Sequence, residues 1–216
     1  MTGSIGVHMV WTGVIQKIGK WPAFLFGTLA IWIFYTLSNQ LTFKAAKILQ
    51  PGIVDGYTPF LSWSIWIYFP YYLIIALAWA LEDDAGELSR FISGLLLINV
   101  ISNLIFFICP SSVVRTPLAE TCDWGLYACE LFSVVYFFDT PANCIPSLHV
   151  ALSTFVGMVW WNKPGFMRFV FLFWGALICL STLTTGQHLF SDLVTGFAVS
   201  GNIWIYLYYI KAEKIT

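Results

Sequence analysis

Residues 146–162, PSLHVALSTFVGMVWWN, and residues 188–205, HLFSDLVTGFAVSGNIWI, are two apolar runs that each carry a histidine at the amino-terminal end. Runs of this length and hydrophobicity are typical of helices that cross a bilayer. Such helices normally exclude ionisable side chains unless these face a partner, water or a substrate. The chain has three histidines, and two of them, His149 and His188, occupy corresponding positions in these runs. The pattern predicts an active site at the boundary of a membrane.

The composition of the whole chain agrees with this interpretation. Of its 216 residues, 59% are hydrophobic and 10% are charged, and the mean hydropathy is +0.79. These values lie far from those of soluble domains and indicate an all-α integral membrane protein. Spans and short connections use up the length, so any chemistry must reside on the spans and their loops. A net charge of −1, without runs of like charge, argues against nucleic acid as a partner.

Six uncharged runs are long enough to be membrane spans, and the fourth is the shortest of them. We expect a six-helix membrane domain over residues 21–216, preceded by an interfacial helix within residues 1–20. The longest loop, 110–146, contains an apolar segment interrupted by Glu130, which we predict to be a short interfacial helix. The six predicted spans are 21–38, 60–81, 91–109, 147–162, 169–186 and 189–210.

The placement of lysine and arginine predicts the orientation, because these residues favour the cytoplasmic side. With the amino terminus inside, seven of the ten lie in cytoplasmic segments and three lie outside. Both termini are then cytoplasmic. No cleavable signal pattern precedes the first span, so we expect the amino terminus to be retained. We expect a bacterial inner membrane with a periplasm-facing site, although a lumenal site in an endomembrane fits the same topology.

This topology brings the candidate site residues to one side of the membrane. Six spans with both termini inside put the 110–146 loop and the turn between the last two spans on the same outer face. Arg115, Ser147, His149, His188 and Asp192 then share that face. An odd number of spans between the two histidines would have separated them.

The five residues have side chains with complementary chemical roles. His188 and Asp192 are four residues apart, so on a helix they are neighbours on one face. The carboxylate can accept the Nδ1 hydrogen of His188 and leave Nε2 as the nucleophile, while His149 protonates the departing oxygen as general acid. Ser147, at a helix start with free N–H groups, and Arg115 can bind phosphate oxygens. The set suits in-line phosphoryl transfer and requires no metal ion or other cofactor.

Residues 146–149, PSLH, and residues 181–196, with the pattern Ser-(six residues)-His-(three)-Asp-(three)-Gly, resemble the second and third signature motifs of the type 2 phosphatidic acid phosphatase (PAP2) superfamily. Residues 55–63, DGYTPFLSW, resemble the branch that contains inositol phosphorylceramide synthases. The resemblance covers about residues 50 to 200. It implies a six-helix membrane fold, a phosphohistidine intermediate, and lipid-phosphate substrates handled at the outer leaflet or lumenal face.

The chain also departs from the family pattern. Where the first motif has a lysine seven residues before an Arg-Pro pair, this chain has Ile108, and Thr116 separates Arg115 from Pro117. Where the third motif has an arginine after its serine, this chain has Thr182. Two phosphate-binding cations are therefore missing, as they often are in the synthase-like branch.

The residues leave three functions open. Simple hydrolysis is favoured, because water is available at the outer face. A phosphotransferase that moves a phospho-headgroup between lipids needs a second pocket for the acceptor, but the missing cations favour it. In a distant alternative, His149 and His188 ligate haem in an electron carrier.

The cysteines and the aromatic residues lead to further predictions about metal binding, disulfides and packing. The five cysteines form no CxxC pair, which argues against a zinc site of the usual spacing. Cys122, Cys129 and Cys144 lie in one loop region, where we favour buried free thiols over a disulfide. The aromatic residues around Tyr68 and Tyr71 are expected to face lipid or to pack between helices.

Overall fold

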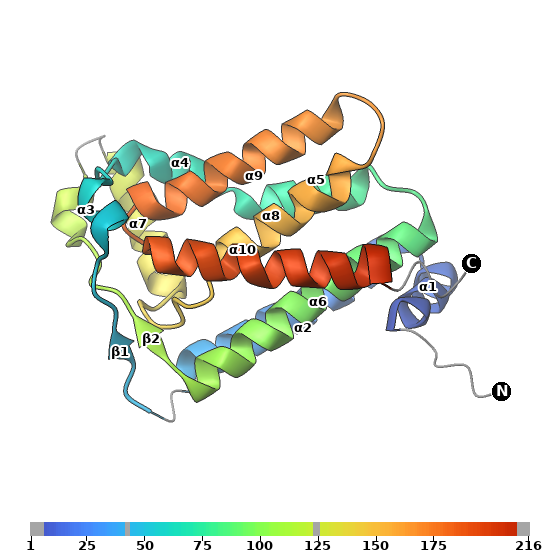
Figure 1. The fold of residues 1–216 in the computed structure, drawn as a ribbon, viewed down its shortest axis with the longest axis horizontal. Coiled ribbons are helices and arrows are strands. Elements are labelled where there is room, and N and C mark those ends of the chain that lie inside the picture. The colour runs from blue at the N-terminus through green and yellow to red at the C-terminus, as the bar shows by residue number, and fades with distance from the viewer. Residues whose placement is uncertain (1–6, 42–43, 123–125, 211–216) are drawn as a thin grey trace.

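The computed structural model describes residues 7–41, 44–122 and 126–210, and these are largely helical (Figure 1). Short 3-10 turns lie at Ser62–Ser64 and Leu118–Thr121, and a π-helical turn, Tyr206–Ile210, extends the last helix. Two short strands, β1 (Lys47–Ile48) and β2 (Ser111–Ser112), pair in parallel. The helices are α1 (Val7–Ile18), α2 (Lys20–Gln40), α3 (Ile53–Tyr57), α4 (Ile65–Tyr68), α5 (Tyr71–Ala80), α6 (Ala85–Ile108), α7 (Leu126–Phe138), α8 (Leu148–Trp161), α9 (Met167–Thr184) and α10 (Phe190–Ile205).

Five helical segments of the described chain are long and apolar enough to cross a membrane, and they correspond to five of the six predicted spans. The predicted fourth span is α8, which has 14 residues. At 1.5 Å per residue it is about 21 Å long, shorter than a hydrocarbon core of about 30 Å. The count of six spans is therefore not confirmed by length. The five segments are Lys20–Gln40, Ser62–Ala80, Ala85–Ile108, Met167–Thr184 and Phe190–Ile210.

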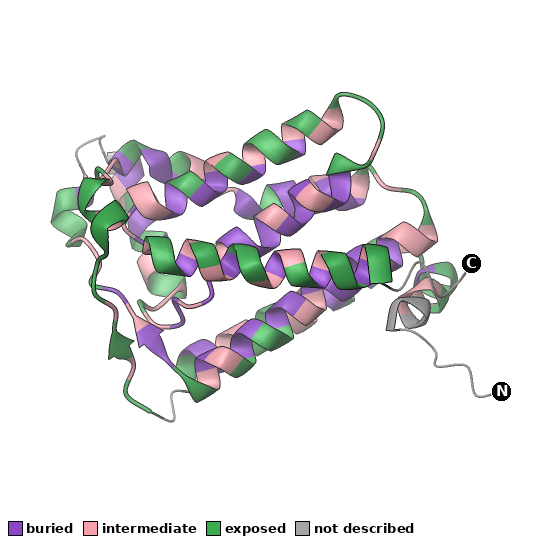
Figure 2. Cartoon of the chain, in the orientation of Figure 1, coloured by how far each residue is buried: buried purple, intermediate pink, exposed green. Residues whose placement is uncertain are grey.

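The short helix α8 lies inside the bundle and packs against α5, α6, α9 and α10. Val150, Ala151 and Phe155 of α8 are completely buried. Figure 2 shows the contrast with α10, whose outer side is exposed along much of its length. A helix that is surrounded by other helices does not face lipid, so the thickness of the bilayer does not fix its length.

The second predicted span, 60–81, is interrupted near its middle. Helix α4 ends at Tyr68 and α5 begins at Tyr71, with Phe69 and Pro70 between them. Proline lacks a backbone N–H and its ring clashes with the preceding turn, which explains the break. Tyr68 and Tyr71, on either side of the break, are both buried.

Different elements lie at the two ends of the helix bundle (Figure 1). Helices α3 and α7 and both strands lie at one end of the bundle, and α1 lies at the other end with the carboxyl-terminal part of α10. Helices α8 and α10 both begin at the end that carries the strands. His149 and His188 therefore lie at the same end, as predicted. Helix α1 packs onto the core through Ile15, and its interfacial position stays a prediction.

Gly196 sets the spacing between α10 and α8. A Cβ atom at this position would lie 2.7 Å from the Ser147 carbonyl oxygen and 3.1 Å from the Val150 Cβ. Because such contacts force the two backbones apart, Gly196→Ala is expected to destabilise the protein by about 1 to 3 kcal/mol. The measurement is the thermal unfolding midpoint of the purified protein in detergent.

Gly201→Ala, on the same helix, is the matched control. Within the part of the chain that the structure describes, its Cβ would meet nothing closer than 4.0 Å, and alanine is the better helix former. We expect an unchanged or slightly higher midpoint. Equal losses in the two variants would contradict the close packing of α10 on α8.

Candidate active site

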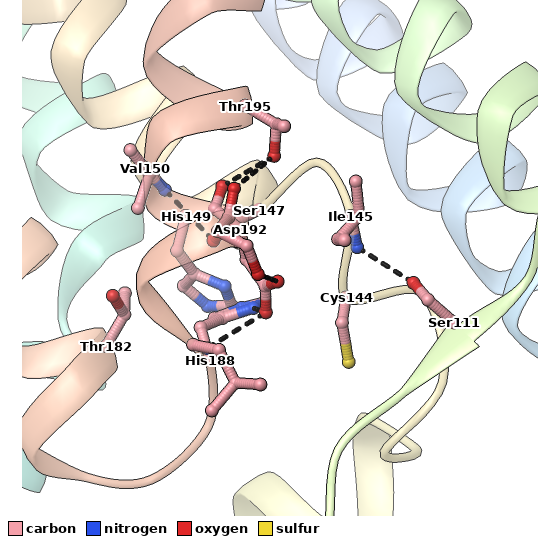
Figure 3. A network of polar contacts seen from close by, with 12 residues as sticks. Ser111, Cys144, Ile145, Ser147, His149, Val150, Thr182, His188, Asp192 and Thr195 are labelled. Atoms are coloured by element: carbon pink, nitrogen blue, oxygen red, sulfur yellow. Dashed lines mark hydrogen bonds and ion pairs between the residues drawn. The ribbon is translucent and has the colours of Figure 1, made fainter. Parts of the chain in front are cut away.

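His188 lies in the turn before α10 and contacts the buried carboxylate of Asp192 (Figure 3). His188 Nδ1 lies 3.3 Å from Asp192 Oδ2. The same oxygen accepts a hydrogen bond from Leu189 N at 3.0 Å, and Asp192 Oδ1 accepts one from Ser191 Oγ at 3.0 Å. The start of α10 thus holds the carboxylate, which faces one ring nitrogen of His188 and leaves Nε2 on the other side. The predicted contact between the two residues is present.

The backbone before His188 is fixed by the end of α9. The Thr182 carbonyl accepts hydrogen bonds from the amides of Gln187 and His188 at 3.2 and 3.1 Å. Gly186 has a φ of +65°, in the left-handed region that favours glycine, and lets the chain turn back toward α10. The Thr182 side chain is buried, and its hydroxyl donates to the Cys179 carbonyl. Thr182 stands where the third family motif has an arginine. Its carbonyl oxygen holds the backbone of His188 in place.

His149, in the first turn of α8, contacts two tyrosine rings. The ring centroids of Tyr68 and Tyr71 lie 4.3 and 4.1 Å from that of His149. The Tyr68 hydroxyl lies 3.3 Å from His149 Nδ1. The ring centroids of His149 and His188 are 5.9 Å apart, so both imidazoles can contact one small group.

The contact between these tyrosines and a site residue was not predicted from the sequence. Tyr68 and Tyr71 are buried and pack between helices, as expected, and His149 is among the residues that they contact. Their neighbour Tyr72 is exposed, as expected. No helical interval in the sequence separates them from the rest, because the helix is interrupted between Tyr68 and Tyr71.

Ser147 joins the starts of α8 and α10. Its Oγ accepts a hydrogen bond from Val150 N at 3.4 Å, which is the contact of a helix cap. Its own N–H donates to the Asp192 carbonyl oxygen at 3.2 Å. Ser147 is completely buried. Ser147 is therefore the N-cap residue of α8. Its contact with phosphate stays a prediction.

Arg115 forms a partly buried ion pair with Asp139, the residue that follows α7. Arg115 Nη2 lies 3.1 Å from Asp139 Oδ2, and the guanidinium carbon lies 5.0 Å from the Tyr136 ring centroid. Tyr35 of α2 donates a hydrogen bond to the Asp139 carboxylate. Burial raises the pKa of the Asp139 carboxyl above its ordinary value, and the charge of Arg115 and the hydrogen bond from Tyr35 oppose this rise.

This ion pair limits what Arg115 can offer a substrate. Part of its guanidinium fork is occupied by Asp139, while Arg115 Nε is buried without a partner among the described residues. Ile108, which stands where the first family motif has a lysine, is exposed at the end of α6. Asp139 was missed by the sequence analysis, and the signal that could have found it is a carboxylate directly after an apolar helix in a chain with few charges.

A cavity of about 290 Å³ borders His188. Its polar wall is formed by Gln50, Asp55, Thr58 and Thr116, and no lysine or arginine is among its described lining residues. Asp55 accepts hydrogen bonds from Phe190 N and Gly52 N, both at 2.7 Å. The segment 55–63, which the sequence analysis singled out, is thereby tied to the first turn of α10.

The three loop cysteines do not behave alike. Cys122 and Cys129 form a disulfide, so the expectation of free thiols is wrong for this pair. Cys144 is a free and buried thiol, as expected. Burial, followed by the nearby carboxylates of Asp192 and Asp139, raises the pKa of Cys144 to about 12. At neutral pH it is a protonated thiol and not a competing nucleophile.

The fold and the site define a class of helical membrane proteins with a paired-histidine centre at one end of the bundle. The family model described as the PAP2 superfamily matches residues 32–206 and includes both histidine motifs. The chain belongs to the PAP2 superfamily. Membership implies phosphoric monoester hydrolase or related phosphotransferase chemistry. A comparison with curated proteins found no match.

Proposed function

We propose that this protein is a membrane lipid-phosphate phosphatase that acts through a phosphohistidine at His188. The observation that carries the proposal is the pair of imidazole rings with centroids 5.9 Å apart, one of which contacts a buried carboxylate. The two rings come from segments 39 residues apart in sequence and meet at one end of the bundle. A phosphoryl group between them is within reach of both.

The reaction follows from the roles of three residues. Asp192 accepts the Nδ1 hydrogen of His188 and fixes the tautomer, so that Nε2 carries the lone pair that attacks phosphorus. The N–P bond forms as the ester P–O bond breaks, and His149 gives its proton to the departing oxygen. His149 then accepts a proton from water, which attacks phosphorus, breaks the N–P bond and releases inorganic phosphate.

Phosphate binding is assigned to Arg115, Ser147 and the free amides at the start of α8. The amino-terminal end of a helix favours anions through its N–H groups and dipole. Arg115 can contribute through its Nε, which has no hydrogen-bond partner among the described residues, because Asp139 occupies only part of its guanidinium. The mechanism uses no metal ion and no other cofactor.

We propose that the site faces the extracytoplasmic side, in a bacterial inner membrane with both termini cytoplasmic. The opposite positions of α1 and the site support this topology, together with the seven-to-three distribution of cationic residues. The Cys122–Cys129 disulfide lies in the loop on the site side, where an oxidising compartment would maintain it. In this arrangement α8 is a sixth span enclosed by the others, and α1 and α7 lie at the interfaces.

A phosphotransferase of the inositol phosphorylceramide synthase type is the second candidate. The cavity beside His188 favours it, because its polar wall without cations suits a neutral hydroxyl-bearing acceptor or leaving group. No comparable observation favours haem, since His149 is in contact with two tyrosine rings and does not line this cavity.

A product assay distinguishes hydrolysis from transfer. The purified protein is incubated in mixed micelles with phosphatidate, phosphatidylglycerophosphate, isoprenyl diphosphate or lipid A, each labelled in its phosphate. Release of labelled inorganic phosphate is the expected result. Label that appears instead on a second lipid or a sugar would replace the phosphatase by the transferase, and label that stays on every substrate would contradict both.

A further inference from the structure

Cys144 lies beside the two residues at the centre of the proposed mechanism. Its Sγ, a ring nitrogen of His188 and a carboxylate oxygen of Asp192 all lie within 4.8 Å of one another (Figure 3). All three residues are buried, and Cys144 has no role in the proposed phosphoryl transfer. The thiol donates a hydrogen bond to the Pro141 carbonyl at 3.2 Å.

The three donor atoms resemble the ligand set of a zinc ion. His188 Nδ1 and Asp192 Oδ2 are 3.3 Å apart. In a tetrahedral zinc site with metal–nitrogen and metal–oxygen distances of about 2.0 to 2.1 Å, two such donors are about 3.3 Å apart. A zinc–sulfur bond is about 2.3 Å long, so binding would draw Cys144 Sγ closer to the other two ligand atoms than the 4.8 Å within which all three lie.

We propose that Cys144, His188 and Asp192 form an inhibitory binding site for Zn²⁺. The set of sulfur, imidazole and carboxylate ligands selects zinc over magnesium and calcium, which prefer oxygen ligands only. On binding, the thiol proton of Cys144 passes to solvent, a sulfur–zinc bond forms, and a water completes the tetrahedron. No oxidation or reduction takes place.

The inhibitory effect rests on the proposed function. Zinc between His188 and Asp192 replaces the contact that orients the imidazole, and it occupies a nitrogen of the nucleophile. The binding of the metal does not rest on that function, because it depends only on the three ligands. Binding and inhibition can therefore be tested separately.

Binding is measured with Co²⁺, which takes zinc sites and reports a cysteine ligand through its sulfur-to-cobalt charge-transfer absorption. The full chain is used in detergent with Cys109→Ala as the background, because Cys109 is an exposed free thiol. The expected result is one bound Co²⁺ with this absorption, displaced by Zn²⁺. Cys144→Ser should abolish the absorption. Cys179→Ser, which removes another buried free thiol outside the cluster, should preserve it.

Inhibition is measured as the Zn²⁺ concentration that halves phosphate release. Cys144→Ser should need at least about ten times more zinc than the background protein, and Cys144→Ala provides the same test with a second side chain. Cobalt absorption that persists in both Cys144 variants would overturn the site. Binding with unchanged inhibition would overturn the inhibitory role. An inactive protein that still binds cobalt through Cys144 would reject the proposed function and leave the metal site supported.

Discussion

His188→Ala is expected to lower the turnover of a lipid phosphate by about 10⁴-fold or more, the scale seen when a catalytic nucleophile is removed. The variant keeps Asp192 and His149 but has no nitrogen that can form the bond to phosphorus. The measurement is the initial rate of phosphate release in mixed micelles. His8→Ala is the matched control, because His8 is the third histidine of the chain and lies in α1, at the far end of the bundle.

The covalent step gives this prediction a second measurement. Wild-type protein mixed with phosphate-labelled substrate and quenched in alkali should carry label, because the N–P bond of phosphohistidine survives alkali and is lost in acid. His188→Ala should carry none. Label retained on His188→Ala, or turnover within about tenfold of wild type, would show that another group is the nucleophile.

His149→Ala is expected to lower turnover of a lipid phosphate by about 10²- to 10⁴-fold, the usual contribution of a positioned general acid. The loss should depend on the leaving group. An alkoxide leaving group needs the proton, whereas the p-nitrophenolate of p-nitrophenyl phosphate departs without one. The variant should therefore retain far more of its activity on the aryl substrate.

The comparison of the two substrates distinguishes general acid catalysis from a merely structural role. If His149 only supported the fold, the two activities would fall by the same factor, since misfolding affects every substrate alike. Tyr68→Phe serves as an additional check, because it retains the ring next to His149 and removes only the hydroxyl near Nδ1. We expect it to lose less activity than His149→Ala.

Local spacing was enough to predict the features that depend on one helix or on counting spans. The four-residue interval between His188 and Asp192 corresponds to a contact of 3.3 Å. The number of predicted membrane crossings, and not any pairwise signal, placed His188 and Asp192 at the same end of the bundle as His149. Apolar run length predicted five of the spans but not the enclosure of α8, because burial by neighbouring helices and burial by lipid select the same residues.

Contacts between distant segments could not be predicted in the same way. The contacts of Asp139 with Arg115 and with Tyr35 join three segments, and no periodicity in the sequence reports them. The position of Cys144 beside His188 depends on how the loop before α8 folds back. In each case no spacing in the sequence identifies the partners of the side chain, and only the folded structure shows them.

The two hydrogen bonds accepted by the Thr182 carbonyl matter for the proposed nucleophile, His188. Because the amides of Gln187 and His188 are both tied to the end of α9, the backbone of the nucleophile is preorganised before any ligand arrives. Little conformational entropy remains to be lost there during the reaction.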